Sequence, residues 1–210
     1  KESVYGNAII LLRDSFAEAH HYRKNPSPEE FVKSMMIFCN NLKDSFDGIT
    51  NSNCSVSIKV PIKEAKVGEH SVLKNLTRDH KNERRDTEKY RSTDHTIIGN
   101  STFSNCLNNV IVNKKNKYYI NNDIKNEKNY RNTSIVCYEN GKLPYNSELV
   151  SPIVPLKQES NENYDCHGFI CIDSDKTDAF DEKYAPAILS GVADGIYDII
   201  ERLNTEINGI

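Results

Sequence analysis

The sequence predicts an α+β fold with a single hydrophobic core. Apolar residues recur at helical spacing near both ends of the chain, they alternate with polar residues in several segments between, and no segment repeats. Hydrophobic residues make up 37% and charged residues 27% of the 210 residues, which are the proportions of a globular rather than a disordered protein. We expect residues 28–210 to form the domain and residues 1–27 to add an N-terminal dimerisation or linker helix.

The first two elements are predicted to be helices. Apolar side chains recur every three or four residues over 4–24 and again over 28–47. Ser27 is a suitable N-cap for the second helix, because its hydroxyl can accept a hydrogen bond from a free backbone N–H of the first turn. Gly48 is expected to end this helix.

The middle of the chain is predicted to form a sheet, because apolar and polar residues alternate there. The predicted strands are residues 54–62, 71–76, 117–121, 134–138, 148–156 and 168–173. Residues 103–112 predict a short helix capped by Ser101 or Thr102, and the charged residues 77–95 predict a mobile loop. Pro152 lacks the N–H that a ladder requires, so we expect it at an edge or a bulge.

A long final helix is predicted from about Asp181 onward. Its apolar residues step by four, three, four, three and four positions, which is the spacing of a heptad seam. The predicted dimer interface on this seam consists of Leu189, Ile196, Ile200 and Leu203. Packing of the same seam against the chain's own sheet stays open as an alternative.

Residues 145–153 combine an early serine with an apolar run that ends in Pro-Ile. A glycine-led strand follows at 168–174, then Phe180 and the C-terminal helix. In this order and spacing the segments resemble the GAF-domain family, most clearly over residues 145–205. The resemblance implies an antiparallel sheet of about six strands, with long N- and C-terminal helices on one face and a small-molecule pocket on the other.

The resemblance also implies a function. We expect a non-catalytic sensory or regulatory domain of a bacterial-type signalling protein, which binds a small ligand, forms a homodimer through its terminal helices and acts on an attached or associated effector. One alternative is a pure protein-interaction module with a vestigial pocket. Another is a cysteine-based redox enzyme similar to free-methionine-sulfoxide reductases, with Cys106 and Cys137 meeting in a pocket.

Polar residues at the ends of predicted elements are candidates for ligand binding, since recognition groups gather at loops and element ends. The candidate residues are Arg78, Asp79, Asn100, Thr102, Tyr119, Asp123, Tyr145 and Ser147. A solvated loop without a ligand is the alternative interpretation of these groups.

Several specialised sites are not expected. Cys166 and His167 resemble the Cys-His pair of bilin-binding GAF domains, but they precede a predicted strand, where neighbouring side chains point to opposite faces. A zinc site formed by Cys166, His167, Cys171 and Asp173 is not expected either, because the last three would share one face of the strand but extend over roughly 20 Å. Phe180 and the acidic pair after it lack the spacing of the cyclic-nucleotide signature. We therefore predict no catalytic residue, no metal and no cofactor.

Charge and hydropathy also restrict the partners. Lys81, Arg84 and Arg85 are interleaved with acidic residues and the formal net charge is −3, so no nucleic-acid partner is expected. No run approaches the roughly 20 apolar residues that span a bilayer. The six scattered cysteines are expected to be free, which favours a cytoplasmic location. Because the chain begins at Lys1, an upstream membrane anchor stays open.

Overall fold

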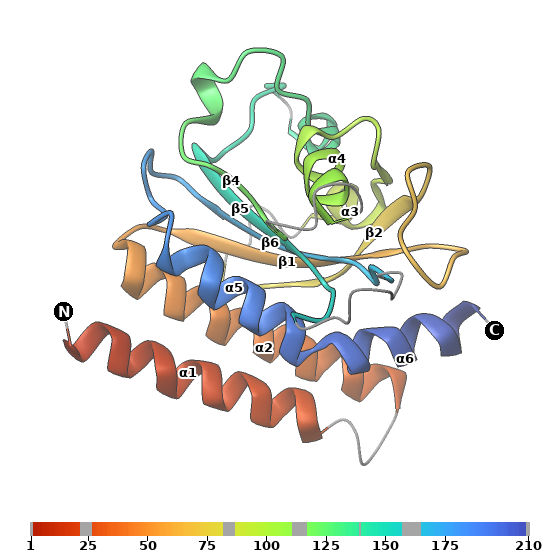
Figure 1. The fold of residues 1–210 in the computed structure, drawn as a ribbon, viewed down its shortest axis with the longest axis horizontal. Helices are drawn as coiled ribbons and strands as arrows, with labels where there is room; N and C mark the ends of the chain where they lie inside the picture. Colours follow the sequence, from red (N-terminus) through yellow and green to blue (C-terminus); the bar gives the residue numbers. More distant parts are fainter. Residues whose placement is uncertain are drawn as a thin grey trace.

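A computed structural model describes residues 2–21, 27–81, 87–110, 117–138, 140–156 and 165–208. Its centre is a six-stranded antiparallel sheet in the order β3-β2-β1-β6-β5-β4 (Figure 1). The strands are β1 (Cys54–Pro61), β2 (Val72–Arg78), β3 (His95–Thr96), β4 (Tyr119–Asn121), β5 (Ser147–Pro152) and β6 (Phe169–Ser174). The nearly all-apolar β6 is paired on both sides, by β1 and β5, and so lies in the interior of the sheet.

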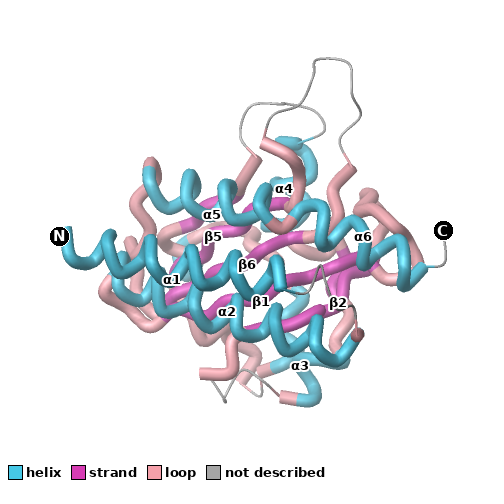
Figure 2. Tube along the Cα trace, turned by 90° about the horizontal axis from the view of Figure 1, so that it is seen from below, coloured by secondary structure: helices cyan, strands magenta, loops and turns pink. Residues whose placement is uncertain are grey.

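Four helices lie below the sheet as drawn in Figure 1, and Figure 2 shows them from beneath. They are α1 (Glu2–His21), α2 (Pro28–Thr50), α5 (Tyr184–Gly195) and α6 (Tyr197–Asn208). The Ser27 side chain accepts a hydrogen bond from the Glu30 N–H at 3.2 Å, which confirms the predicted cap of α2. This helix continues past Gly48 and ends where Asn51 adopts a left-handed conformation, with φ of 49°.

The main hydrophobic core fills the space between these helices and the sheet. Alternate residues of β1, including Val56 and Ile58, lie in this core together with fully buried phenylalanines of α2. Phe38 of α2 also meets Phe16 of α1 edge to face, with ring centroids 6.2 Å apart. The intervening residues of β1, Ser55, Ser57 and Lys59, must then point to the other face of the sheet, and they are polar.

Shorter elements cover the opposite face of the sheet: α3 (Glu88–Ser92), α4 (Ser101–Asn108) and the 3-10 helices η2 (Ile124–Asn126) and η3 (Thr133–Cys137). A second apolar cluster holds α4 in place, in which the rings of Phe103 and Phe169 lie 4.8 Å apart. The cap of α4 is Asn100 rather than Ser101 or Thr102, and its side chain accepts hydrogen bonds from two backbone N–H groups of the first turn.

Three local predictions were wrong or incomplete. Residues 134–138 do not form a strand, because the Asn132 side chain accepts from the Ser134 N–H and starts the 3-10 turns of η3. The predicted loop 77–95 contains α3, whose buried Tyr90 anchors it, while its residues 82–86 lie outside the described residues. Pro152 belongs to an inner strand, but it lies beyond the residues that pair with β4 and is paired only with Phe169 of β6, so its position is a local edge.

The predicted long final helix is two helices. It begins at Tyr184 and breaks at Ile196, whose ψ of 3° separates α5 from α6. The four predicted interface residues, Leu189, Ile196, Ile200 and Leu203, are all buried in the main core of this single chain. The seam therefore packs within the chain, and the homodimer stays a prediction that would need other residues.

Two further expectations concern the membrane and the thiols. No helix among the described residues combines the length and the apolar character that crossing a bilayer requires. All six cysteines are free thiols; Cys137 and Cys171 are half-buried and the other four are buried.

Candidate functional site

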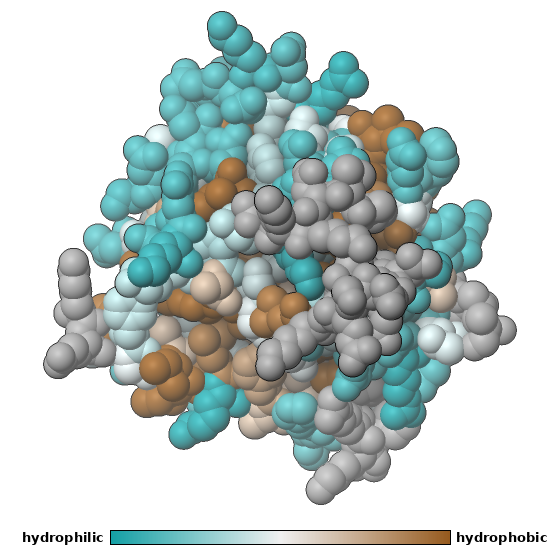
Figure 3. All heavy atoms as spheres, in the orientation of Figure 1, coloured by the Kyte–Doolittle hydropathy of each residue, from teal (hydrophilic) through white to brown (hydrophobic). Residues whose placement is uncertain are grey.

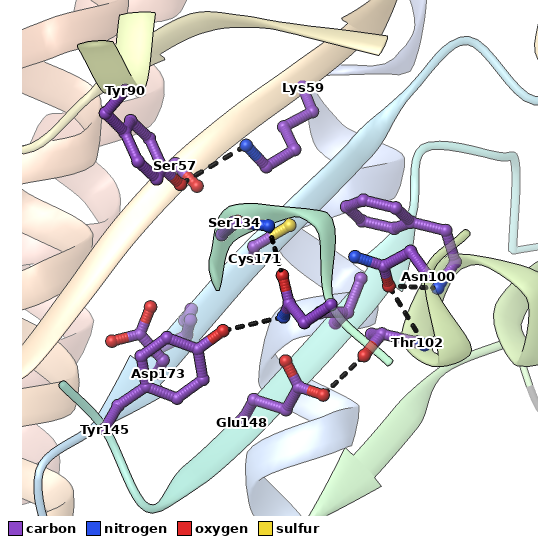
Figure 4. A pocket seen from close by; sticks show the side chains of 14 residues that line it. Ser57, Lys59, Tyr90, Asn100, Thr102, Ser134, Tyr145, Glu148, Cys171 and Asp173 are labelled. Atoms are coloured by element: carbon purple, nitrogen blue, oxygen red, sulfur yellow. Dashed lines mark hydrogen bonds between the residues drawn. The ribbon is translucent and has the colours of Figure 1, made fainter. Parts of the chain in front are cut away.

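A small cavity lies on the polar face of the sheet, beneath α3, α4 and η3 (Figure 4). Its floor comes from the three central strands, with the side chains of Ser57, Lys59, Glu148, Cys171 and Asp173. Its roof carries Tyr90, Asn100, Thr102, Asn132, Ser134 and Tyr145. The volume of about 30 Å³ holds a few water molecules or one compact polar group of a ligand.

One end of the cavity is acidic. Glu148 of β5 and Asp173 of β6 are direct partners in the antiparallel register, so their side chains lie opposite each other on the same face. Oε1 of Glu148 accepts hydrogen bonds from Oγ1 of Thr102 and from the hydroxyl of Tyr130, the latter at 2.6 Å. The second oxygen of Glu148 points toward the middle of the cavity (Figure 4).

Burial is the main reason that the pKa of Glu148 is raised to about 7, and the nearby Asp173 raises this pKa further. The hydrogen bonds from Thr102 and Tyr130 act in the opposite direction, since they favour the ionised carboxylate. Near neutral pH, Glu148 is therefore present in both its protonated and its ionised form, and a cation beside it would favour the ionised form.

The roof above the carboxyls is fixed by one asparagine. Nδ2 of Asn132 donates to the hydroxyls of Tyr130 at 2.9 Å and Tyr145 at 2.8 Å, and its Oδ1 accepts from the Ser134 N–H at 2.8 Å. Tyr130 in turn donates to Glu148. The roof and the sheet are thus joined through a continuous chain of hydrogen bonds that runs through the acidic end.

The other end of the cavity is basic. Nζ of the buried Lys59 donates to the Tyr90 hydroxyl at 3.3 Å and lies 4.8 Å from the centre of the same ring. The guanidinium carbon of Arg78 lies 4.7 Å from that ring centre. Burial lowers the pKa of the neighbouring His95 to about 3, with a further contribution from the charge of Lys59, so this imidazole is neutral.

Cys171 lies between the two ends. Burial raises the pKa of its thiol to about 12; the charge of Lys59 lowers this pKa, while Glu148 and Asp173 raise it. Burial also raises the pKa of Cys166 to about 12 and that of Cys106 well above its usual value. These three thiols are therefore protonated at neutral pH, which makes them weak nucleophiles.

The structure brings only some of the predicted site residues together. Asn100, Thr102 and Tyr145 line the cavity. Arg78 and Asp79 are outside its lining, in a buried cluster with Ser55.

The remaining predicted site residues are also outside the lining. The Tyr119 hydroxyl accepts from Nδ2 of Asn121, and Oδ2 of Asp123 accepts from Nδ2 of Asn126. Ser147 donates to the carbonyls of Asn122 and Lys176, so its hydroxyl fixes loops.

Comparisons with known proteins place this geometry in a known fold. No family model and no curated protein matches the chain. Solved structures do match. The GAF domain of an Acinetobacter phosphoenolpyruvate-protein phosphotransferase is 11% identical, with a TM-score of 0.57 and 94% of each chain covered. The chain has a GAF-like fold.

Other GAF-like matches differ in what they do. The type II free methionine-R-sulfoxide reductase of Thermoplasma acidophilum is 23% identical, with a TM-score of 0.50, and the match covers 86% of this chain and 97% of the reductase. The chromophore-binding domain of a bacteriophytochrome from R. palustris is 9% identical, with a TM-score of 0.53, and the match covers 98% and 62% of the two chains. The GAF-like fold is therefore common to sensors and enzymes. The function of this chain has to be inferred from the residues of its site and not from its fold.

The residues that sequence reasoning missed are those of the GAF-like sheet itself: Ser57, Lys59, Glu148, Cys171 and Asp173. Their signal was the alternation within each strand, which places polar residues on one face of three neighbouring strands. This alternation served only to place the strands, and it did not assign these residues to the pocket. Within the described residues, no group of three or more His, Cys, Asp and Glu residues is arranged to hold a metal ion.

Proposed function

We propose that this GAF-like domain is a non-catalytic sensory or regulatory module that binds a compact ligand with a positively charged group. The observation that carries the proposal is the direct pairing of Glu148 with Asp173 at one end of the cavity. Like charges directly opposite each other on a sheet repel, and a cation between them would relieve that repulsion. An ammonium group fits because its three N–H donors match the carboxylate oxygens.

Occupancy of this site would act on the roof. Glu148 is joined to α4 through Thr102 and to the segment before η3 through Tyr130. A cation that binds the second oxygen of Glu148 favours the ionised carboxylate, which accepts both hydrogen bonds more strongly. The ligand therefore favours one arrangement of the roof, and an attached or associated effector would respond to this shift in population.

Thermal-shift measurements test this function. A panel of small primary amines should raise the melting temperature near pH 8, where Glu148 is mostly ionised, while alcohols of equal length should not. Glu148→Gln and Asp173→Asn should each remove the response because they remove the negative charge. Glu206→Gln is the matched control, since Glu206 is an exposed residue of α6 that pairs with Arg202 at 2.7 Å.

Two outcomes would contradict the proposal. If amines and alcohols shift the melting temperature equally, the acidic end does not select a cation. If no amine binds although the wild-type domain is folded, the alternative of a protein-interaction module with an unused pocket gains support.

A second candidate function is reduction of free methionine-R-sulfoxide, as named for the Thermoplasma acidophilum protein. Its supporting observation is a cavity thiol, Cys171, on the same sheet face as the Glu148 carboxyl. In such a reaction the Cys171 sulfur would take the sulfoxide oxygen and become a sulfenic acid while methionine leaves, and an added dithiol would reduce the sulfenic acid and release water. The raised pKa of Cys171 argues against it, because little thiolate is present at neutral pH.

Direct assay separates the two functions. The domain is incubated with L-methionine-R-sulfoxide and dithiothreitol, and free methionine is quantified by chromatography. We expect no methionine beyond that formed with heat-denatured protein. Turnover that Cys171→Ser abolishes would establish the enzyme and refute the non-catalytic proposal.

A further inference from the structure

Lys59 is a buried cation at the basic end of the cavity, and only 3% of the residue is exposed. Among the residues that the structure describes, its ammonium group has one hydrogen-bond partner, the uncharged hydroxyl of Tyr90 at 3.3 Å. An ammonium group has three N–H donors, so most of its capacity is unused. Buried charges are normally paired, because an unpaired one loses its hydration without compensation.

The other buried lysine and arginine residues within the described ranges each have an acidic partner. Lys43 pairs with Asp47 at 2.5 Å and also donates to Asn53 at 3.1 Å. Arg78 donates to Ser55 at 2.5 Å and lies 3.7 Å from Asp79. Each thus has a carboxylate within 4 Å, whereas no carboxylate of the described residues forms an ion pair with Lys59.

The surroundings of Lys59 favour an anion from outside the chain. Arg78 lies over the same Tyr90 ring, and the charge of Lys59 contributes to the lowered pKa of His95. The potential at this end of the cavity is therefore positive, while Glu148 and Asp173 make the opposite end negative. A ligand with a single charge would satisfy only one of the two ends.

We propose that Lys59 is the anion-binding residue of the cavity and that the ligand is a zwitterion with separated charges, cationic toward Glu148 and anionic toward Lys59. The cationic half rests on the proposed function; the anionic half rests on Lys59 alone. In β6, Asp173 and Phe169 are the register partners of Glu148 and Lys59, and they stand four residues apart. This spacing is roughly 13 Å between Cα atoms. The side chains shorten this gap, so several carbon atoms should separate the two charges of the ligand. A ligand of that length exceeds the closed cavity of about 30 Å³, so its binding requires the roof of α3, α4 and η3 to move outward.

Isothermal titration calorimetry with compounds of graded length tests the proposal. The probes are glycine, β-alanine, 4-aminobutyrate and 6-aminohexanoate, each compared with the alkylamine and the alkyl carboxylate of equal length. For wild-type protein we expect one of the longer amino acids to bind at least tenfold more tightly than its matched amine. Lys59→Met, which keeps the length of the side chain without its charge, should remove that preference. Amines should still bind, and no more weakly than to wild type, because the substitution removes a positive charge from the same cavity.

Other results separate this proposal from the proposed function. If amines bind but the carboxylate adds nothing and Lys59→Met has no effect, the role of Lys59 is refuted and the cation site stands. If carboxylates bind through Lys59 and amines do not bind, the anion site stands and the cation site is refuted. If no probe binds, both are refuted.

The melting temperature of Lys59→Met checks a purely structural role. Removing an unpaired buried charge should leave the melting temperature unchanged or raise it. A lower melting temperature combined with unchanged zwitterion binding would show that Lys59 serves only to hold Tyr90, and would overturn the proposal.

Discussion

Asp79 joins the ends of β1 and β2 and is fully buried. Its Oδ1 accepts hydrogen bonds from the Ser55 hydroxyl and from the Val56 N–H, both at 2.7 Å, and its own N–H donates to the Val56 carbonyl at 3.0 Å. The adjacent Arg78 supplies the compensating charge. Such a cluster is sensitive to the loss of one member, because the remaining groups stay buried.

Asp79→Ala should lower the free energy of unfolding by about 3–5 kcal/mol, since it removes the carboxylate beside the buried Arg78 and leaves the Ser55 hydroxyl and the Val56 N–H without their acceptor. Urea denaturation followed by circular dichroism measures this. The control is Asp94→Ala, which removes a surface carboxylate 3.6 Å from Lys74. That change should cost less than about 1 kcal/mol. If both substitutions lowered the free energy of unfolding equally, the buried cluster would contribute no more to stability than a surface ion pair.

Glu148 should make stability depend on pH. Its folded-state pKa of about 7 exceeds the ordinary value of 4.5, so folding favours the protonated carboxyl. The stabilisation is complete below pH 4.5 and is lost as the pH rises through 7. Relative to Glu148→Gln, the wild-type protein should lose at most about 3 kcal/mol of unfolding free energy over this interval.

Urea denaturation of both proteins at pH 4.5, 6 and 8 tests the Glu148 prediction. Other titrating groups affect the two proteins alike, so the difference between them isolates Glu148. The raised pKa would be refuted if the difference in unfolding free energy between the two proteins did not change with pH. It would also be refuted if wild type became more stable relative to Glu148→Gln as the pH rises.

At the scale of elements, β6 begins at a close approach between strands. Gly168 precedes β6 with φ of 154°, and a Cβ built there would lie 2.4 Å from the backbone oxygen of Lys59. Backbone of a central strand cannot move aside cheaply, so only glycine fits.

Gly168→Ala should therefore destabilise the protein by more than about 2 kcal/mol through steric conflict and backbone strain. Gly191→Ala is the matched control: Gly191 lies inside α5, and a Cβ there meets nothing within 4 Å. It should stabilise the protein by roughly 0.5–1 kcal/mol, because alanine favours the helix. Thermal unfolding monitored by circular dichroism compares the two, and the same sign for both would contradict this account.

Long segments with strong periodicity were predictable from the sequence. The two N-terminal helices, β1 and β6 followed directly from their apolar spacing, and the sheet with helices on one face followed from the GAF resemblance. Residues 134–138 were mistaken for a strand because Ser134–Cys137 has strand-like composition, while the Asn132 cap that starts η3 is a local contact. The break at Ile196 was not predicted because the heptad spacing of the apolar residues continues across it, as in one uninterrupted helix.

The site was less predictable than the fold. Asn100, Thr102 and Tyr145 were found because they lie at element ends. Glu148, Asp173 and Lys59 come together only through strand order and register, which set residues 59 and 148 on opposite sides of β6. Periodicity within one strand cannot reveal which residues of another strand lie beside it.

At the scale of the whole molecule, the surface gives a revised candidate for the predicted homodimer. Val4, Tyr5, Ile9 and Ile10 of α1 are exposed, and apolar side chains gather at the end of the molecule where α1 begins (Figure 3). Exposed apolar surface of this kind is typical of an interaction site. The dimer stays a prediction, now with α1 as its contact in place of the buried heptad seam.

Ile9→Asp should convert a dimer to a monomer without loss of fold, because Ile9 is 67% exposed. Ile200→Asp should instead unfold the domain, since that side chain is fully buried in the main core. Light scattering reports the mass and circular dichroism reports the fold. A wild-type monomer at all concentrations, or a dimer unaffected by Ile9→Asp, would rule out this contact.

The alternation of side chains along the central strands has a consequence for how the protein can change. Val56 and Ile58 secure the helical layer, whereas their neighbours Ser57 and Lys59 face the cavity. Substitutions at cavity positions need not disturb the layer that supplies most of the apolar burial. Substitutions at Ser57 and Lys59 could therefore change which ligand is recognised while the apolar packing of Val56 and Ile58 stays the same. Evolution or protein engineering could in this way exchange one ligand for another on the same scaffold.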